Sequence, residues 1–218
     1  MDPLVAGLAL LQSVGVAAVT GPILRRLPAP VDEPETDPYR PLATPRFALV
    51  AAALSLVAAL LTGLLLTPGL LTAWLALNTL GVLLGCIDAR TTFLPAVLTW
   101  AAGLLAALGV GISAWWLQNP WLLAQAALGA LFGWGLFWLF WRFGRGFGFG
   151  DVRLAAVIGA TAGVVSPTFP LLALLAGAIA GGVWGVVALI GGRRGYPYGP
   201  SLVMGPYLAM LAIGWSGG

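Results

Sequence analysis

The sequence predicts an all-α membrane protein, a polytopic bundle of about eight transmembrane helices, and two observations support this prediction. Charged residues make up 8% of the 218 residues and hydrophobic residues 60%, whereas a soluble domain has roughly 25% charged residues. Long apolar runs alternate with short connections rich in turn-forming residues, such as Thr67-Pro68-Gly69. A soluble fold could not cover so much apolar surface with so few polar residues, so the chain is predicted to lie in a lipid bilayer.

Eight apolar segments are candidate membrane spans, because a helix needs about 20 mostly apolar residues to cross a bilayer. They cover residues 3–24, 47–67, 70–87, 94–117, 121–141, 151–165, 168–190 and 200–215. Continuous apolar runs of this kind exclude barrel strands, which alternate in polarity. The first segment is not expected to be a cleaved signal peptide, because its start carries Asp2 and no basic residue.

All ten basic residues are arginines, and they are predicted to lie on one side of the membrane. Each lies in or close to the connection after the first, third, fifth or seventh segment, and the other connections contain none. Because positively charged loops stay in the cytoplasm, both termini are predicted to face outward. The same loops explain the net charge of +3 without a nucleic-acid partner. We expect a multi-pass protein of the plasma (inner) membrane.

The one long polar connection, residues 25–46, suggests a division into a first helix with its linker, residues 1–46, and a membrane domain, residues 47–218. Six prolines in the linker disfavour a regular helix. Four of the seven acidic residues of the chain lie in it: Asp32, Glu33, Glu35 and Asp37. The preferred interpretation is an extended, solvated cytoplasmic linker, and attraction of a basic substrate is the alternative.

Only two carboxylates, Asp88 and Asp151, lie outside the linker and the N-terminus. Asp88 follows an apolar run, where an anion opposes the helix dipole; a surface pair with Arg90 is the structural alternative. Asp151 opens a short apolar segment, for which a helix N-cap is the alternative. A full span would have to start about five residues earlier and would place Asp151 about 7 Å inside the membrane boundary. Carboxylates at such positions are usually functional.

Both acids are predicted on the cytoplasmic side, where the third and sixth segments could bring them together. Two carboxylates at close range do not both ionise easily, so the pair shares a proton. Such a pair suits acid–base hydrolysis of a peptide bond, because one member activates water and the other polarises the carbonyl. The glycines before Asp151, Gly148 and Gly150, are predicted to allow unusual backbone dihedrals and close approach of an extended substrate.

The chain has no histidine and a single cysteine, Cys86. Histidine is the commonest metal ligand, and one cysteine forms neither an internal disulfide nor a Cys-Cys zinc pair. We therefore predict no metal and no other cofactor. Cys86 itself is expected to be a small residue in helix packing.

Three motifs resemble those of the type IV prepilin peptidases, which are membrane aspartyl proteases of the GxGD class. Residues 148–154 read GFGDVRL and resemble the GxGDxKL motif. Residues 87–95 read IDARTTFLP and are similar to the other aspartate motif, with a proline seven positions after the acid. Residues 196–202 read YPYGPSL and resemble the C-terminal PFGP element.

The resemblance implies an intramembrane aspartic endopeptidase with Asp88 and Asp151 as the catalytic pair. It further implies substrate-binding or supporting roles for four residues: Gly148, Gly150, Arg153 and Pro95. The implied partners are type IV prepilins or the related pseudopilins. Their short basic leader would be removed after a glycine at the cytoplasmic face of the membrane.

This chain also departs from the family pattern. Many members methylate the new N-terminus and carry two Cys-x-x-Cys pairs between the first two helices. Residues 25–46 contain no cysteine, so a zinc-bound loop is excluded there and N-methylation stays open. Arg153 replaces the usual lysine, which keeps the charge but changes the hydrogen-bond geometry, and Ala96 stands where an acid or amide often follows the proline.

Two other functions are compatible with the residues alone. A proton-coupled membrane transporter could use Asp88 and Asp151 as a proton relay. A non-catalytic assembly factor would tolerate loss of either carboxylate.

Overall fold

The computed structural model describes residues 3–30, 35–144, 148–192 and 197–214, and within these ranges the chain is helical and forms no strand. The all-α prediction is confirmed. Some residues used in the sequence analysis lie outside the described ranges: the acids Asp2, Asp32 and Glu33, three of the ten arginines (Arg145, Arg193 and Arg194), and Tyr196 of the third motif.

The helices follow one another with short connections. They are α1 Pro3–Leu24, α2 Pro45–Leu65, α3 Leu71–Ala76, α4 Val82–Thr91, α5 Ala96–Trp116, α6 Trp121–Phe143, α7 Phe149–Gly163, α8 Phe169–Ile190 and α9 Gly199–Ile213. Five residues with π-helical geometry, Leu77–Gly81, join α3 to α4, and a 3₁₀ turn, Pro68–Leu70, precedes α3. The run from Pro68 to Thr91 is therefore one continuous helical span.

All eight predicted segments are helical, but they are not equally long. Six helical runs in the described ranges are long and apolar enough to cross a membrane. Helices α7 and α9 have 15 residues each, or about 22 Å, which is less than the roughly 30 Å of a bilayer core. The predicted polytopic bundle is thus confirmed, with six long helical spans and two short helices in the described residues.

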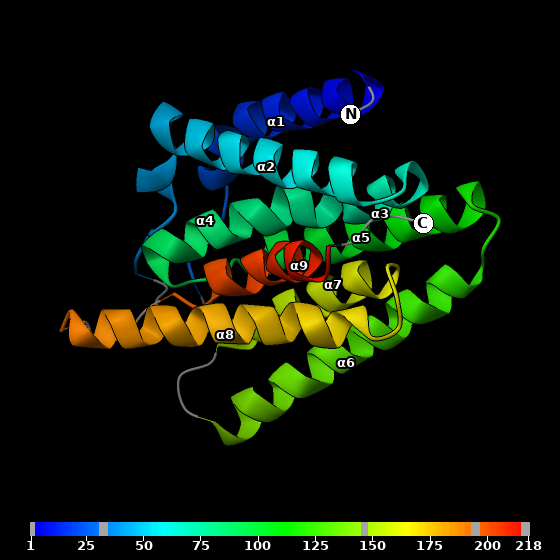
Figure 1. The fold of residues 1–218 in the computed structure, drawn as a ribbon. Coiled ribbons are helices and arrows are strands. Elements are labelled where there is room, and N and C mark those ends of the chain that lie inside the picture. Colours follow the sequence, from blue (N-terminus) through cyan, green and yellow to red (C-terminus); the bar gives the residue numbers. More distant parts are fainter. Residues whose placement is uncertain (1–2, 31–34, 145–147, 193–196, 215–218) are drawn as a thin grey trace.

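The two short helices lie among the long helices near the centre of the view in Figure 1. Helix α7 packs against α5, α6 and α8, and α9 packs against α4 and α8. A Cβ atom on Gly129 of α6 would collide with the carbonyl of Gly159 in α7, and the reverse also holds. The two backbones touch here, which is how small residues strengthen helix packing in lipid.

The outer helices present apolar side chains to their surroundings. Leu11 of α1, Leu131 of α6 and Val183 of α8 are all exposed, as expected where lipid rather than water covers the surface. The C-terminal ends of α1, α4 and α6 lie on the left of Figure 1, and those of α2, α5 and α7 lie on the right. Arg90 and Arg142 lie in the last turns of α4 and α6, so these two arginines share one end of the bundle; its cytoplasmic orientation stays a prediction.

The linker between α1 and α2 is not solvated throughout. A 3₁₀ turn, Arg40–Leu42, interrupts it. Tyr39 just before this turn is only 2% exposed and belongs to the same apolar core as Leu24 at the end of α1. The interpretation of a fully solvated linker is therefore wrong at Tyr39, because this aromatic side chain anchors the linker to the bundle.

Candidate active site

Asp88 lies in the last turn of α4, which continues to Thr91 rather than ending before the acid. The side chain is 4% exposed, and its Oδ2 accepts a hydrogen bond of 2.8 Å from the backbone N–H of Gly199 at the start of α9. Arg90 is exposed, and the alternative of a surface pair between Asp88 and Arg90 is wrong. Asp88 instead points inward and joins α4 to α9.

The backbone after Asp88 turns sharply. Thr92 adopts a left-handed conformation with φ of 59°, and its N–H donates to the carbonyl of Asp88 at 2.8 Å. This C-cap ends α4 and directs the chain through Phe93 and Leu94 to Pro95 at the N-cap of α5. The predicted supporting residue Pro95 is thereby held close to the acid that it follows in sequence.

Asp151 is the third residue of α7, and its side chain is 8% exposed. Its Oδ2 accepts a hydrogen bond of 3.0 Å from the backbone N–H of Gly148, the residue just before the helix. The N-cap alternative is therefore partly correct: Asp151 is not the N-cap, but its carboxylate reaches back to it, as in one half of a capping box. This hydrogen bond holds the carboxylate at the N-terminus of α7.

The glycines near the acids provide space rather than unusual dihedrals. Gly148 has ordinary extended backbone angles, φ −82° and ψ 153°, so the prediction of unusual dihedrals is wrong there. A Cβ atom on Gly150 would lie 2.7 Å from Cβ of Leu94, and one on Gly199 would lie 2.8 Å from Oδ2 of Asp88. Both positions need glycine because a neighbouring side chain occupies the space.

Asp88 and Asp151 line one cavity of about 480 Å³ and lie within electrostatic range of each other. The other predicted residues line the same cavity: Pro95, Gly148, Gly150 and Arg153. The structure thus brings together residues of two motifs that lie far apart in the sequence. Their catalytic or binding roles remain proposals.

The cavity has two walls that sequence reasoning did not assign to the site. The linker contributes Pro28, Ala29, Pro30 and Tyr39, and the segment before α9 contributes Pro197 and Tyr198. The second wall had a signal in the YPYGPSL motif, which also supplies the N–H donor to Asp88. The first had none, because nothing in a proline-rich linker indicates which of its residues turn towards the bundle.

Arg153 provides the positive charge of the cavity. Its guanidinium lies over the ring of Phe149, with Cζ 5.6 Å from the ring centroid. The Nε atom is buried and has no hydrogen-bond partner within the described residues. Arg153 lines the cavity, and its guanidinium group can donate to a carbonyl or carboxylate oxygen of a bound molecule.

The arrangement suits acid–base chemistry. Each carboxylate has one oxygen engaged by a backbone N–H, and each lies in a largely apolar environment that favours sharing of a proton. Among the described residues, no three cysteine or acidic side chains gather in a group that could hold a metal ion. Two such carboxylates facing one cavity are able to activate a water molecule and to protonate a leaving group.

A family model described as the type IV leader peptidase family matches residues 74–186, which is more than half of the 218-residue chain. The matched range contains both aspartates and the three helices α4, α5 and α7 that bring residues to the cavity. Comparisons with curated proteins and with solved structures give no match.

Proposed function

Because the chain belongs to the type IV leader peptidase family, we propose that it is an aspartic endopeptidase that cleaves prepilin-type precursors. Membership of this family makes the chain a peptidase, and its long apolar helices make it a multi-pass membrane protein. The proposal adds that it removes the short basic leader of type IV prepilins or pseudopilins at the cytoplasmic face. The observation that supports it best is the single cavity lined by Asp88 and Asp151.

In the proposed reaction the two carboxylates share one proton. The ionised member takes a proton from a water molecule as that water attacks the carbonyl carbon of the scissile peptide bond. The protonated member donates a hydrogen bond to the carbonyl oxygen and stabilises the negative charge that develops there. The tetrahedral intermediate then collapses, the C–N bond breaks, and the leaving amine takes up a proton from the pair.

The hydrogen bonds from Gly148 and Gly199 orient the pair for these steps. Each backbone N–H occupies one carboxylate oxygen, Oδ2 in both cases, and leaves Oδ1 for water or substrate. Groups that are already oriented lose less conformational entropy on reaching the transition state than mobile groups do, which favours catalysis. Arg153, which lines the cavity, would hold a backbone carbonyl of the substrate with its guanidinium group.

The surroundings of the cavity fit a basic leader followed by an apolar helix. The linker that forms one wall carries exposed acidic residues, Glu35 and Asp37, which would attract lysine or arginine side chains of the leader. This attraction between exposed charges is screened by salt and adds little affinity. The apolar outer surface of the bundle would accommodate the hydrophobic segment that follows the cleavage site.

The family assignment favours the peptidase over the two alternatives, since the family is described as one of leader peptidases. A proton relay would use the same two carboxylates, but no other feature of the described residues favours transport. A non-catalytic assembly factor would not need both acids in one cavity.

A cleavage assay tests the proposal. The full chain is reconstituted in phospholipid vesicles with a prepilin precursor, and the product is analysed by mass spectrometry, with Asp151→Asn as the matched inactive control. We expect the wild type to release the leader after its terminal glycine and the variant to leave the precursor intact. An intact precursor with the wild type, or equal cleavage by both proteins, would overturn the proposal. The same spectra show whether the new N-terminus gains a methyl group.

A further inference from the structure

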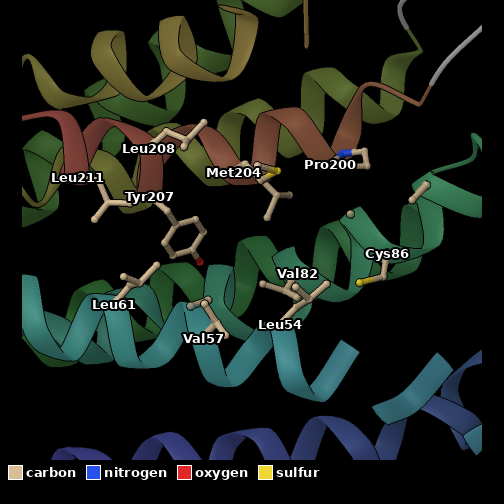
Figure 2. A pocket seen from close by; sticks show the side chains of 14 residues that line it. Leu54, Val57, Leu61, Val82, Cys86, Pro200, Met204, Tyr207, Leu208 and Leu211 are labelled. Carbon is tan, nitrogen blue, oxygen red and sulfur yellow. The ribbon is translucent and has the colours of Figure 1, made fainter. Parts of the chain in front are cut away.

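An apolar groove lies on the face of α4 that points away from the two carboxylates. It has a volume of about 340 Å³ and is bounded by α2, α4 and α9. Figure 2 shows Leu54, Val57 and Leu61 of α2 across from Met204 and Tyr207 of α9. No charged side chain lines it.

The groove continues towards the arginine-bearing end of the bundle. A second cavity, of about 390 Å³, shares Leu54, Cys86 and Ala89 with the groove. Arg46 at the start of α2 and Arg90 at the end of α4 line this second cavity. The two cavities therefore adjoin on the outside of the bundle, and together we call them the channel, which is apolar along most of its length and basic at one end.

The basic end carries positive charge that no carboxylate among the described residues neutralises. No carboxylate lines either part of the channel. Both guanidinium groups are exposed, and neither forms an ion pair within the ranges that the structure describes. Two like charges at one small cavity repel each other unless an anion lies between them.

We propose that this channel binds one anionic phospholipid of the cytoplasmic leaflet. The phosphate lies between Arg46 and Arg90, and an acyl chain fills the groove between α2, α4 and α9. Guanidinium groups match phosphate oxygens in charge and in hydrogen-bond geometry. Basic pockets between transmembrane helices on the cytoplasmic side are also where anionic lipid headgroups bind.

The dimensions favour an acyl chain over a second helix. A helix with its side chains is about 10–12 Å across, so it could only lie against the rim of a groove of about 340 Å³. A single hydrocarbon chain is thin enough to enter. The apolar helix of a substrate remains the competing occupant, and the experiment below separates the two.

Lipid binding to the full-length protein in detergent micelles tests the proposal. Phosphatidylglycerol and phosphatidylcholine with identical acyl chains are titrated separately, and bound lipid is counted by native mass spectrometry. We expect the wild type to bind phosphatidylglycerol about tenfold more tightly, because each basic residue near the headgroup adds to its attraction. The double variant Arg46→Gln/Arg90→Gln should lose this preference. Arg142→Gln, an exposed arginine outside the channel, is the matched control and should keep it.

A second pair of variants tests the groove itself. Leu54→Trp fills the junction of the two cavities and should weaken binding of both lipids at least fivefold, whereas Leu49→Trp on the same helix should not, since Leu49 lines neither cavity. Both leucines are exposed, so neither change disturbs the core. Equal affinity of the wild type for the two lipids would overturn the proposal. So would an unchanged preference in the arginine variant, or photo-crosslinking from position 54 to the substrate helix instead of lipid.

Discussion

Helix α4 separates two cavities of opposite chemistry, although the residues that face them are neighbours in the sequence. Asp88 faces the cavity that Asp151 also lines, whereas Cys86 and Ala89 face the apolar groove against α2 and α9. Successive residues of a helix are turned by about 100°, so a shift of one or two positions moves a side chain from one cavity to the other. Distance in the sequence from Asp88 is therefore a poor guide to a catalytic role. The face of α4 on which a residue lies decides which of the two cavities it lines.

The two sides are also held together differently. On the catalytic side, backbone N–H groups of glycines hold the carboxylates. On the groove side, side chains form a buried chain of hydrogen bonds, from the Tyr207 hydroxyl to Asn78 Oδ1 at 2.8 Å and from Asn78 Nδ2 to Thr62 Oγ1 at 2.9 Å. Changes on the first side should alter the reaction, and changes on the second should alter stability.

Among substitutions that leave both carboxylates in place, the largest effect is expected for Gly199→Ala. The new Cβ atom would lie 2.8 Å from Oδ2 of Asp88, so the carboxylate must move, and a misplacement of about 1 Å costs about 100-fold in rate. We expect a 10- to 100-fold loss of kcat in the cleavage assay. Gly182→Ala in α8, whose Cβ would meet no atom within 4 Å, is the control, and an equal loss there would refute the steric explanation.

A smaller loss is expected for Arg153→Gln. The change removes a charged donor from the cavity but keeps a neutral one, so we expect a loss at the lower end of the range for a hydrogen bond to a charged group, about 1.5 kcal/mol or roughly tenfold in kcat/KM. Arg153→Lys keeps the charge and should retain most of the activity. If both variants behave like the wild type in steady-state kinetics, Arg153 does not contact the substrate.

A still smaller effect on activity is expected for Tyr39→Ala, in the part of the linker that lines the cavity. Tyr39→Ala removes the buried ring that anchors the linker, so KM should rise severalfold with little change in kcat, whereas Tyr39→Phe should behave like the wild type. Limited proteolysis should show earlier cutting within residues 25–46 only in the alanine variant. Unchanged KM and proteolysis would show that this wall does not contribute to substrate binding.

Tyr39 also predicts that the attachment of the linker to the bundle depends on pH. Burial raises the pKa of the Tyr39 phenol from 10.0 to about 12, so its neutral form is favoured in the folded state. The contribution of Tyr39 to stability is complete below pH 10 and is lost as the pH rises towards 12. Linker cutting should increase in this range in the wild type but not in Tyr39→Phe.

The smallest effect is expected for Cys86→Ala, on the groove side of α4 and two residues from Asp88. Its cleavage rate should equal that of the wild type within about twofold, because the side chain lines only the groove and the cavity beside it. The variant also serves as the matched control for substitutions of Asp88. A loss comparable to that of Gly199→Ala would contradict the separation of the two faces.

Much of the fold was predictable because apolar runs and turn-forming residues act locally. The start of α1, the break at Pro120 and the end of α8 all follow from such signals. The short lengths of α7 and α9 were predictable too, since the segments 151–165 and 200–215 match these helices within two residues. What the sequence does not display is how so short a helix is held, which for α7 is by packing against α5, α6 and α8. The π-helical turn at Leu77–Gly81 also leaves no periodic signal in so uniformly apolar a stretch.

The candidate site was predictable to a similar degree. Asp88 and Asp151 stand out because carboxylates are rare in this chain, and the glycine motif identifies Gly148 and Gly150. The bond from Gly199 to Asp88 joins residues 111 positions apart, and the approach of Tyr39 depends on how the linker folds back. Contacts of this range are set by tertiary packing, which a single sequence does not display.

The central claim is that Asp88 and Asp151 act as one catalytic pair, and a double-mutant cycle on the cleavage rate tests it most directly. Rates are measured for the wild type, Asp88→Asn, Asp151→Asn and the double variant, each reconstituted in the same vesicles. We predict that each single change lowers kcat by about 10²–10⁴-fold and that the double variant is no slower than the slower single variant, as for residues that act as a unit. Independent, multiplicative losses, or wild-type activity in either single variant, would contradict the claim.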